Sequence, residues 1–191
     1  MAHGGTALSL IRLFFQLLFL RVGPEDMPSG QRPMLVALAL YLVVGILLDI
    51  AVTGEGHAGL GSGLLLLAAD ALVLAGYSAG LAALRGHRPR IPQMLTALLG
   101  ATAMLGLVAW PLVVMQPSAS EVGEGSIGWW SLAMIALFAW NLVVLGQIYR
   151  RTLDFGAALG VLAALGYFVL SSLVYTGLAL QLLPGDTGLP S

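Results

Sequence analysis

The chain has 191 residues, of which 59% are hydrophobic and only 9% are charged, and its mean hydropathy is +0.95. These values exclude an ordinary soluble domain and predict an integral membrane protein built of helices. The net charge is −1, all eight basic residues are arginine, and the lack of cysteine excludes disulfides, cysteine-ligated metals and thiol chemistry.

The first predicted element covers residues 6–21, an apolar run that carries Ser9, Arg12 and Gln16 on one helical face. At about 1.5 Å per residue this helix is roughly 24 Å long, which is shorter than the ~30 Å hydrocarbon core. A crossing would also bring Arg12 into lipid. The pattern therefore predicts an amphipathic helix in the membrane interface, with a re-entrant segment or a sixth crossing as alternatives.

A linker and the first two spans follow. Residues 22–33 contain three prolines, two glycines and an adjacent pair of acids, which predicts a turn-rich segment outside the membrane. The first span is predicted over residues 34–53 and is interrupted only by Asp49. After a short polar stretch that contains Glu55 and His57, the second span is predicted over residues 60–84.

Three more spans are predicted after the second. The third begins with Ile91-Pro92 and carries Trp110 near its far end, where it suits an interfacial anchor. Trp129-Trp130 marks the start of the fourth. The three spans are predicted over residues 91–115, 129–148 and 155–183. The domain organisation is thus a leader and linker (1–33), an all-α bundle of five transmembrane helices (34–183) and a polar tail (184–191).

The arginines predict the orientation, because basic residues near helix ends are retained in the cytoplasm. With five spans and a cytoplasmic amino terminus, all eight arginines face the cytoplasm, whereas Glu55, Glu121, Glu124 and Asp186 lie outside. We therefore expect a multi-pass protein of a bacterial inner membrane with its carboxyl terminus outside. The arginines that follow spans two and four are also candidates for contact with lipid headgroups: Arg85, Arg88, Arg90, Arg150 and Arg151.

Polar side chains within the spans are the candidates for chemistry, because intramembrane acids are costly and seldom face lipid. Asp70 lies deepest, Tyr77 is close to the same face, and Asp49 could meet Asp70 on one seam with Asn141 of the fourth span. One interpretation is a proton or cation site. The other, which we favour because the spans contain no basic partner, is that these groups fix helix packing. Further candidates come from the fifth span: Ser171, Ser172, Tyr175 and Thr176.

Catalytic and metal sites find little support in the sequence. The three histidines are His3, His57 and His87, all outside the spans, so none can act there as a base or ligate haem. An aspartate-pair protease would need Asp49 and Asp70 at one depth, and they differ in depth. We expect no catalytic residue, no metal, no cofactor and no nucleic-acid partner, although His57 with Glu55, or His87 among arginines, could bind a metal or a lipid phosphate.

Small residues at four-residue spacing predict close helix packing. The pairs are Gly76 with Gly80 in the second span and Gly156 with Gly160 in the fifth, which Ala164 continues. Such stripes can join helices within one subunit or between subunits. We expect packing within the chain, so the partners are the bilayer and, as an open alternative, other membrane proteins or a second copy.

The apolar leader, the linker Gly23-Pro24-Glu25-Asp26-Met27-Pro28 and five closely spaced spans together resemble the Yip/Yif-type five-helix membrane family and its bacterial relatives. The resemblance implies a five-helix membrane domain, and in eukaryotic members it implies roles in membrane trafficking with small GTPases. The short amino terminus here does not provide the long cytosolic region of those members, so that partner is not expected.

These observations favour a non-enzymatic scaffold, membrane-organising or assembly component. The alternative is a small transporter or proton- or ion-coupled protein that uses Asp70. A lipid-modifying enzyme that uses loop residues is a weaker third hypothesis.

Overall fold

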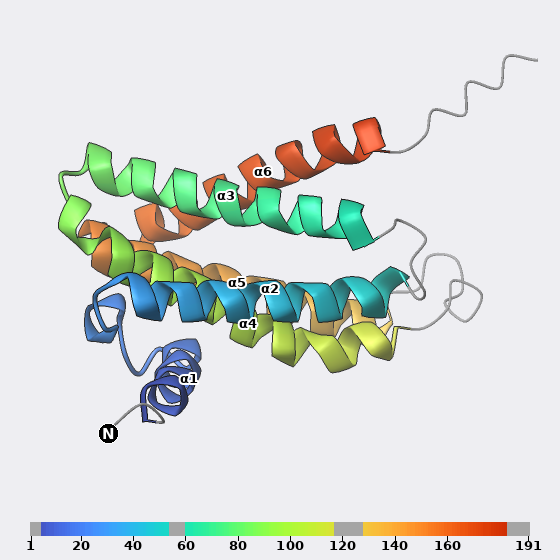
Figure 1. Ribbon diagram of the computed structural model, residues 1–191, viewed down its shortest axis with the longest axis horizontal. Helices are drawn as coiled ribbons and strands as arrows, with labels where there is room; N and C mark the ends of the chain where they lie inside the picture. Colours follow the sequence, from blue (N-terminus) through green and yellow to red (C-terminus); the bar gives the residue numbers. More distant parts are fainter. Residues whose placement is uncertain (1–4, 54–59, 117–127, 183–191) are drawn as a thin grey trace, which may run out of the picture.

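The computed structural model describes the chain except residues 1–4, 54–59, 117–127 and 183–191. The described residues form helices and contain no strand, which confirms the predicted all-α class. Figure 1 shows the helices in chain order, joined in part by two 3₁₀ turns, η1 and η2. The elements are α1 (Gly5–Leu18), η1 (Pro24–Asp26), α2 (Gln31–Thr53), α3 (Leu60–Leu84), η2 (Arg88–Arg90), α4 (Ile91–Val114), α5 (Trp129–Leu153) and α6 (Ala157–Leu182).

Helices α2 to α6 are long and apolar enough to cross a membrane, which matches the five predicted spans. Two boundaries differ from the prediction by three residues or more. Helix α2 begins at Gln31 rather than 34, because Pro33 falls in its first turn, where a missing amide N–H costs nothing. Helix α5 continues past 148 to Leu153, because Arg150 and Arg151 are good helix formers and extend it into a polar region.

Helix α4 is the centre of the bundle. It packs against α1, α2, α3 and α5, and its residues from Met94 to Leu105 are largely buried. Small residues make this possible, since Ala97, Gly100 and Ala101 let neighbouring helices approach closely. A Cβ at Gly100 would overlap the ring of Phe14, so this glycine is needed for α1 to pack against α4.

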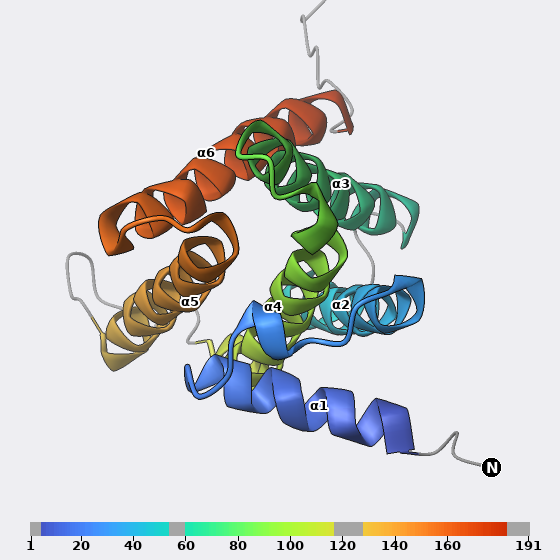
Figure 2. The ribbon, with the colours of Figure 1, turned by 90° about the vertical axis from the view of Figure 1, so that its left-hand side faces the viewer.

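Helix α1 lies across the bundle beside α4 rather than along it (Figure 2). One face, which includes Leu10, Phe14 and Leu17, is buried, while Ile11 and Phe15 on another face remain exposed. A short apolar helix is thus present where the leader helix was predicted, and its amphipathic character stays a prediction. Its transverse direction suits a helix at the edge of the hydrocarbon layer rather than a sixth crossing.

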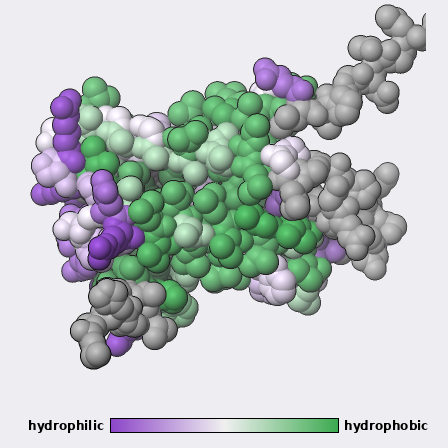
Figure 3. All heavy atoms as spheres, viewed as in Figure 1, coloured by the Kyte–Doolittle hydropathy of each residue, from purple (hydrophilic) through white to green (hydrophobic). Residues whose placement is uncertain are grey.

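Polar residues gather at one end of the bundle, where the connections η1 to α2, α3 to α4 and α5 to α6 lie (Figure 3). We call this the arginine end, because Arg85, Arg88, Arg90, Arg150 and Arg151 all belong to these connections or the adjoining helix termini. The sides of the bundle are apolar, as expected of surfaces that face lipid. The loops with Glu55, His57, Glu121 and Glu124, and the tail, lie outside the described residues.

Helix packing does not follow the predicted glycine pairs. A Cβ at Gly76, Gly80 or Gly156 would meet nothing within 4 Å, so packing within the chain does not occur at these positions. The spacing could not reveal this, because a small-residue stripe looks the same whether it faces a helix or lipid. Gly160 does lie at a close approach, where a Cβ would overlap the carbonyl oxygen of Gly146 on α5.

Candidate functional site

Asp70 is the centre of a polar cluster at the middle of the bundle. It lies 14 positions before the end of α3 (84 − 70), Tyr41 lies 10 positions into α2 (41 − 31), and Tyr167 lies 10 positions into α6 (167 − 157). At about 1.5 Å per residue, these side chains come from levels roughly 15–21 Å from the arginine end. The cluster is therefore close to the midplane of a ~30 Å hydrocarbon core.

Three hydroxyls donate hydrogen bonds to the Asp70 carboxylate. Tyr41 donates to Oδ2, Ser171 donates to Oδ1, and Tyr167 lies 3.0 Å from both oxygens. Tyr41 and Tyr167 are buried, while Asp70 itself is partly buried. We call Tyr41, Asp70, Tyr167 and Ser171 the Asp70 cluster. It joins α2, α3 and α6 through one carboxyl group.

Tyr77, which was expected beside Asp70, belongs to a separate contact nearer the arginine end. Its hydroxyl donates to the Ala163 carbonyl at 2.9 Å and lies against Gly166, where a Cβ would not fit. Next to it, the buried Tyr149 and Ser78 hydroxyls are 2.8 Å apart. These bonds connect α3 to α5 and α6, so Tyr77 acts in helix packing rather than in the Asp70 cluster.

Asp49 does not share a seam with Asp70. It is exposed on α2, and its carboxylate packs against Gly63 near the start of α3, seven positions before Asp70. Seven residues correspond to about 10 Å along the helix. Of the α6 candidates, Ser171 belongs to the Asp70 cluster, whereas Ser172, Tyr175 and Thr176 are exposed.

Asn141 lines a cavity within the membrane-spanning part of the bundle. The cavity has a volume of about 380 Å³ and lies between α2, α3, α4 and α5. Its walls are mostly apolar, but Tyr41 of the Asp70 cluster also lines it, together with Thr102. The side-chain oxygens of Thr102 and Asn141 are buried, and neither has a hydrogen-bond partner among the described residues. Asn141 is thus connected to Asp70 through Tyr41 and this cavity, not by a direct bond.

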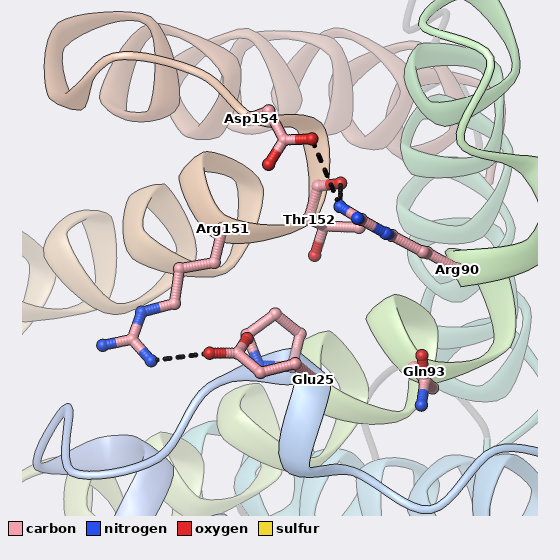
Figure 4. A pocket seen from close by; sticks show the side chains of 7 residues that line it. Glu25, Arg90, Gln93, Arg151, Thr152 and Asp154 are labelled. Atoms are coloured by element: carbon pink, nitrogen blue, oxygen red, sulfur yellow. Dashed lines mark hydrogen bonds and ion pairs between the residues drawn. The ribbon is translucent and has the colours of Figure 1, made fainter.

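A second pocket, of about 440 Å³, lies at the arginine end between η1, α4 and α5 (Figure 4). Two oppositely charged pairs line it. Arg151 Nη1 lies 3.0 Å from Glu25 Oε1, and Arg90 Nη1 lies 3.3 Å from Asp154 Oδ2. We call it the arginine-end pocket. Since these side chains are between about one third and two thirds exposed, each pair contributes at most about 1 kcal/mol to stability.

Local backbone structure holds the pocket residues in place. The η1 turn is closed by the Gly23 N–H, which donates to Asp26 Oδ2 at 2.8 Å, and Gln93 Nε2 donates to the Met27 carbonyl at 3.1 Å. Asp154 ends α5 with a positive φ of 52°, which aspartate tolerates better than most residues. The linker and the α5–α6 turn thereby bring both carboxylates to the pocket.

The other predicted headgroup arginines lie around this pocket rather than in it. The Arg85 guanidinium stacks 4.5 Å from the centre of the Phe155 ring, and Arg150 Nη1 lies 3.3 Å from Gln147 Oε1. Arg88 is exposed on η2. His87 Nε2 lies 3.3 Å from Asp154 Oδ2, and the Arg90 backbone N–H donates to the His87 carbonyl at 3.0 Å. In the part of the chain that the structure describes, no three metal-ligating side chains come together.

Sequence reasoning missed Tyr41 and Tyr167. A signal was present, because a tyrosine in the middle of a span is far from the membrane interface and its hydroxyl needs a partner. The sequence also gave no reason to group Glu25 with Arg151, since 126 positions separate them.

Comparison with known proteins adds no family: no family model, curated protein or solved structure matches this chain. The resemblance to the Yip/Yif-type family therefore stays a prediction.

Proposed function

We propose that the chain is a non-enzymatic scaffold or assembly component of the membrane, whose bundle is held together by the Asp70 cluster. The observation that supports this most is the number of bonds to Asp70. An ionised carboxylate offers about four acceptor positions, and the three hydroxyls make four contacts with it. A carboxyl group that is occupied in this way serves as a polar link between helices.

Proton- or ion-coupled transport is the second candidate. It is favoured by Tyr41, which both donates to Asp70 and lines the cavity that contains Asn141. Ionisable groups within membrane spans often mark ion or proton pathways. In this alternative, a proton or cation would take the place of the hydroxyls at the Asp70 carboxylate. The cavity would provide the route by which the ion reaches Asp70.

An Asp70→Asn variant in proteoliposomes separates the two functions. Under the scaffold proposal, the variant unfolds more easily in denaturant, and the wild type shows no pH-driven flux that depends on Asp70. Under the transport alternative, flux is lost while the fold is retained. Asp49→Asn is the matched control, since it removes an exposed carboxylate of the same type. Loss of flux with unchanged stability would overturn the scaffold proposal.

Cross-linking in native membranes tests whether the chain assembles with other proteins. A scaffold is expected to capture the same few neighbours reproducibly. Gly76→Leu should reduce the capture of these neighbours. A Cβ there meets nothing in the chain, so the substitution should leave the fold intact and act only on assembly with other proteins. Ala139→Leu on α5, also at an exposed position, is the control. Capture of no consistent neighbour by the wild type would contradict the scaffold proposal.

We further propose that the protein belongs to a bacterial inner membrane, with its amino terminus and the arginine end in the cytoplasm. The clustering of arginines at the connections of one end supports this orientation. Helix α1 then lies in the cytoplasmic interface, consistent with its transverse direction and its exposed Ile11 and Phe15. A Yip-like role remains part of this proposal on the basis of the linker and the five spans.

A further inference from the structure

We infer that the arginine-end pocket binds the phosphoethanolamine headgroup of a membrane lipid. This inference is independent of the scaffold proposal, since it rests on a different region of the molecule. It follows from the position of the pocket, its pattern of charges, the unused hydrogen-bonding capacity of its arginines and a buried hydroxyl that points into it.

The position fits a lipid headgroup. The pocket lies where α4 begins and α5 ends, at the polar end of the bundle next to the apolar sides (Figure 3). A headgroup can therefore enter while its acyl chains stay against the helices. The volume of about 440 Å³ is in the range of pockets that hold small ligands.

The charges favour a ligand that carries both signs. Two guanidiniums and two carboxylates line the pocket, so its formal charge is zero. A bare anion would gain from Arg90 and Arg151 but would be repelled by Glu25 and Asp154. A zwitterion can place its phosphate near the arginines and its ammonium group near a carboxylate.

Both arginines retain donors for a phosphate. Among the described residues, Arg151 bonds only through Nη1, and Arg90 uses Nη1 for both Asp154 and the Thr152 carbonyl. A guanidinium has five N–H donors in a planar arrangement that matches phosphate oxygens in pairs. The two arginines line the pocket from different elements, η2 and α5, and in Figure 4 Arg90 points toward Thr152 and Asp154 while Arg151 points toward Glu25.

Thr152 supplies an independent indication of a ligand. The residue is only 3% exposed, and its hydroxyl has no hydrogen-bond partner within the described ranges. In Figure 4 the hydroxyl points into the space between Arg90, Arg151 and Glu25. Buried polar atoms are nearly always paired, so this oxygen is expected to bond to a group that enters the pocket.

The ammonium group defines the specificity. A primary ammonium donates three hydrogen bonds and suits the carboxylate of Glu25 or Asp154, whereas a trimethylammonium has no N–H to donate. The site should therefore prefer phosphatidylethanolamine to phosphatidylcholine with the same acyl chains. The site should also prefer phosphatidylethanolamine to phosphatidylglycerol, whose headgroup has a phosphate and no cation.

The test is native mass spectrometry of the purified full chain, titrated with these three lipids in matched acyl form. We expect phosphatidylethanolamine to bind at least tenfold more tightly than either of the others. Soluble O-phosphoethanolamine should compete for the site at high concentration, and inorganic phosphate should compete much less. Equal binding of all three lipids, or equal competition by inorganic phosphate, would overturn the inference.

Variants locate the site. Glu25→Gln should remove most of the preference for ethanolamine over choline, and Arg151→Gln and Thr152→Val should weaken phosphatidylethanolamine binding. Arg150→Gln is the matched control, because Arg150 is a neighbouring arginine that bonds to Gln147 and does not line the pocket. Thermal unfolding of each variant checks the fold, and Glu25→Gln is at an exposed position where folding should persist. An equal effect of Arg150→Gln and Arg151→Gln would refute a specific pocket.

Discussion

The hydroxyls of Tyr41 and Tyr167 should stabilise the bundle as one network, and a double-mutant cycle with phenylalanine tests this. Each Tyr→Phe change removes an oxygen and leaves the ring, so packing is retained. Oδ2 of Asp70 accepts from both tyrosines, whereas Oδ1 accepts from Tyr167 and Ser171. Either single variant leaves every carboxylate oxygen with a donor, but the double variant leaves Oδ2 with none among the described residues.

The expected magnitudes follow from these bonds. Hydrogen bonds between transmembrane helices contribute about 0.6 kcal/mol on average and up to about 1.7 kcal/mol. Each single variant should lower the free energy of unfolding by an amount in that range. The double variant should exceed the sum of the singles by about 0.5–3 kcal/mol, because groups in one network are coupled and an unpaired buried oxygen is costly.

Equilibrium unfolding in mixed micelles measures all three values. Tyr175→Phe is the control, since Tyr175 lies on the same helix as Tyr167 but is 56% exposed. Its free energy of unfolding should change by less than about 0.5 kcal/mol. Strict additivity of the two cluster variants, or an equal effect of the control, would show that Asp70 does not link α2 and α6.

Three further predictions concern packing and orientation. Gly160→Ala should destabilise the bundle by about 1–3 kcal/mol, because its Cβ would meet the Gly146 carbonyl, whereas Gly156→Ala should be tolerated. Equilibrium unfolding compares the two variants, and equal effects would contradict close packing of α6 on α5 at Gly160. Trp130→Phe should cost about 0.5–1.5 kcal/mol in the same assay through loss of the 2.6 Å bond from Nε1 to the Leu112 carbonyl, and Trp129→Phe, at an exposed position, should cost less. Because the chain has no cysteine, a single introduced cysteine can be labelled selectively with a membrane-impermeant maleimide. In intact cells, Ser29→Cys should be protected from the label and Gly128→Cys should be labelled. The opposite pattern would reverse the orientation.

The spans could be predicted because hydropathy and length decide them directly. A run such as residues 60–84 satisfies its backbone hydrogen bonds only as a helix in lipid, whatever its neighbours are. Ends were less certain, because polar residues can extend a helix beyond the hydrocarbon layer, as Arg150 and Arg151 do in α5. Helix α2 likewise begins before the predicted residue 34, at Gln31, and has Pro33 in its first turn.

The site was predictable only in its central residue. Asp70 is conspicuous because an acid in a span must find partners, but the identity of those partners depends on how helices are arranged and rotated. Tyr77 and Asp70 are seven positions apart on α3, yet they contact different parts of α6. Helical periodicity describes one helix at a time, so it cannot decide which neighbour a side chain meets.

The polar bonds also predict where the bundle can move. The bonds described here between α3 and α6 are those of Tyr77 with Ala163 and of Asp70 with Tyr167 and Ser171, all from mid-depth to the arginine end. Beyond Ser171, α6 is largely exposed, with Leu173 and Leu180 about 70% accessible. In lipid, burial of apolar surface gives helices no hydrophobic driving force to associate, so interhelical hydrogen bonds and close packing decide where they stay together. We therefore expect the two helices to separate most easily at the end opposite the arginines.

Spin labels test this expectation, because each pair of cysteines is unique in a chain without native cysteine. The pair Leu84→Cys and Leu159→Cys reports on the arginine end, and Leu64→Cys with Leu180→Cys reports on the other; all four positions are exposed. Pulsed dipolar spectroscopy should give a broader distance distribution for the second pair. Asp70→Asn should broaden that distribution further and leave the first pair nearly unchanged, because Tyr77 still holds the arginine end. Equal widths at both ends would mean that apolar packing, rather than the polar bonds, controls the separation of α3 and α6.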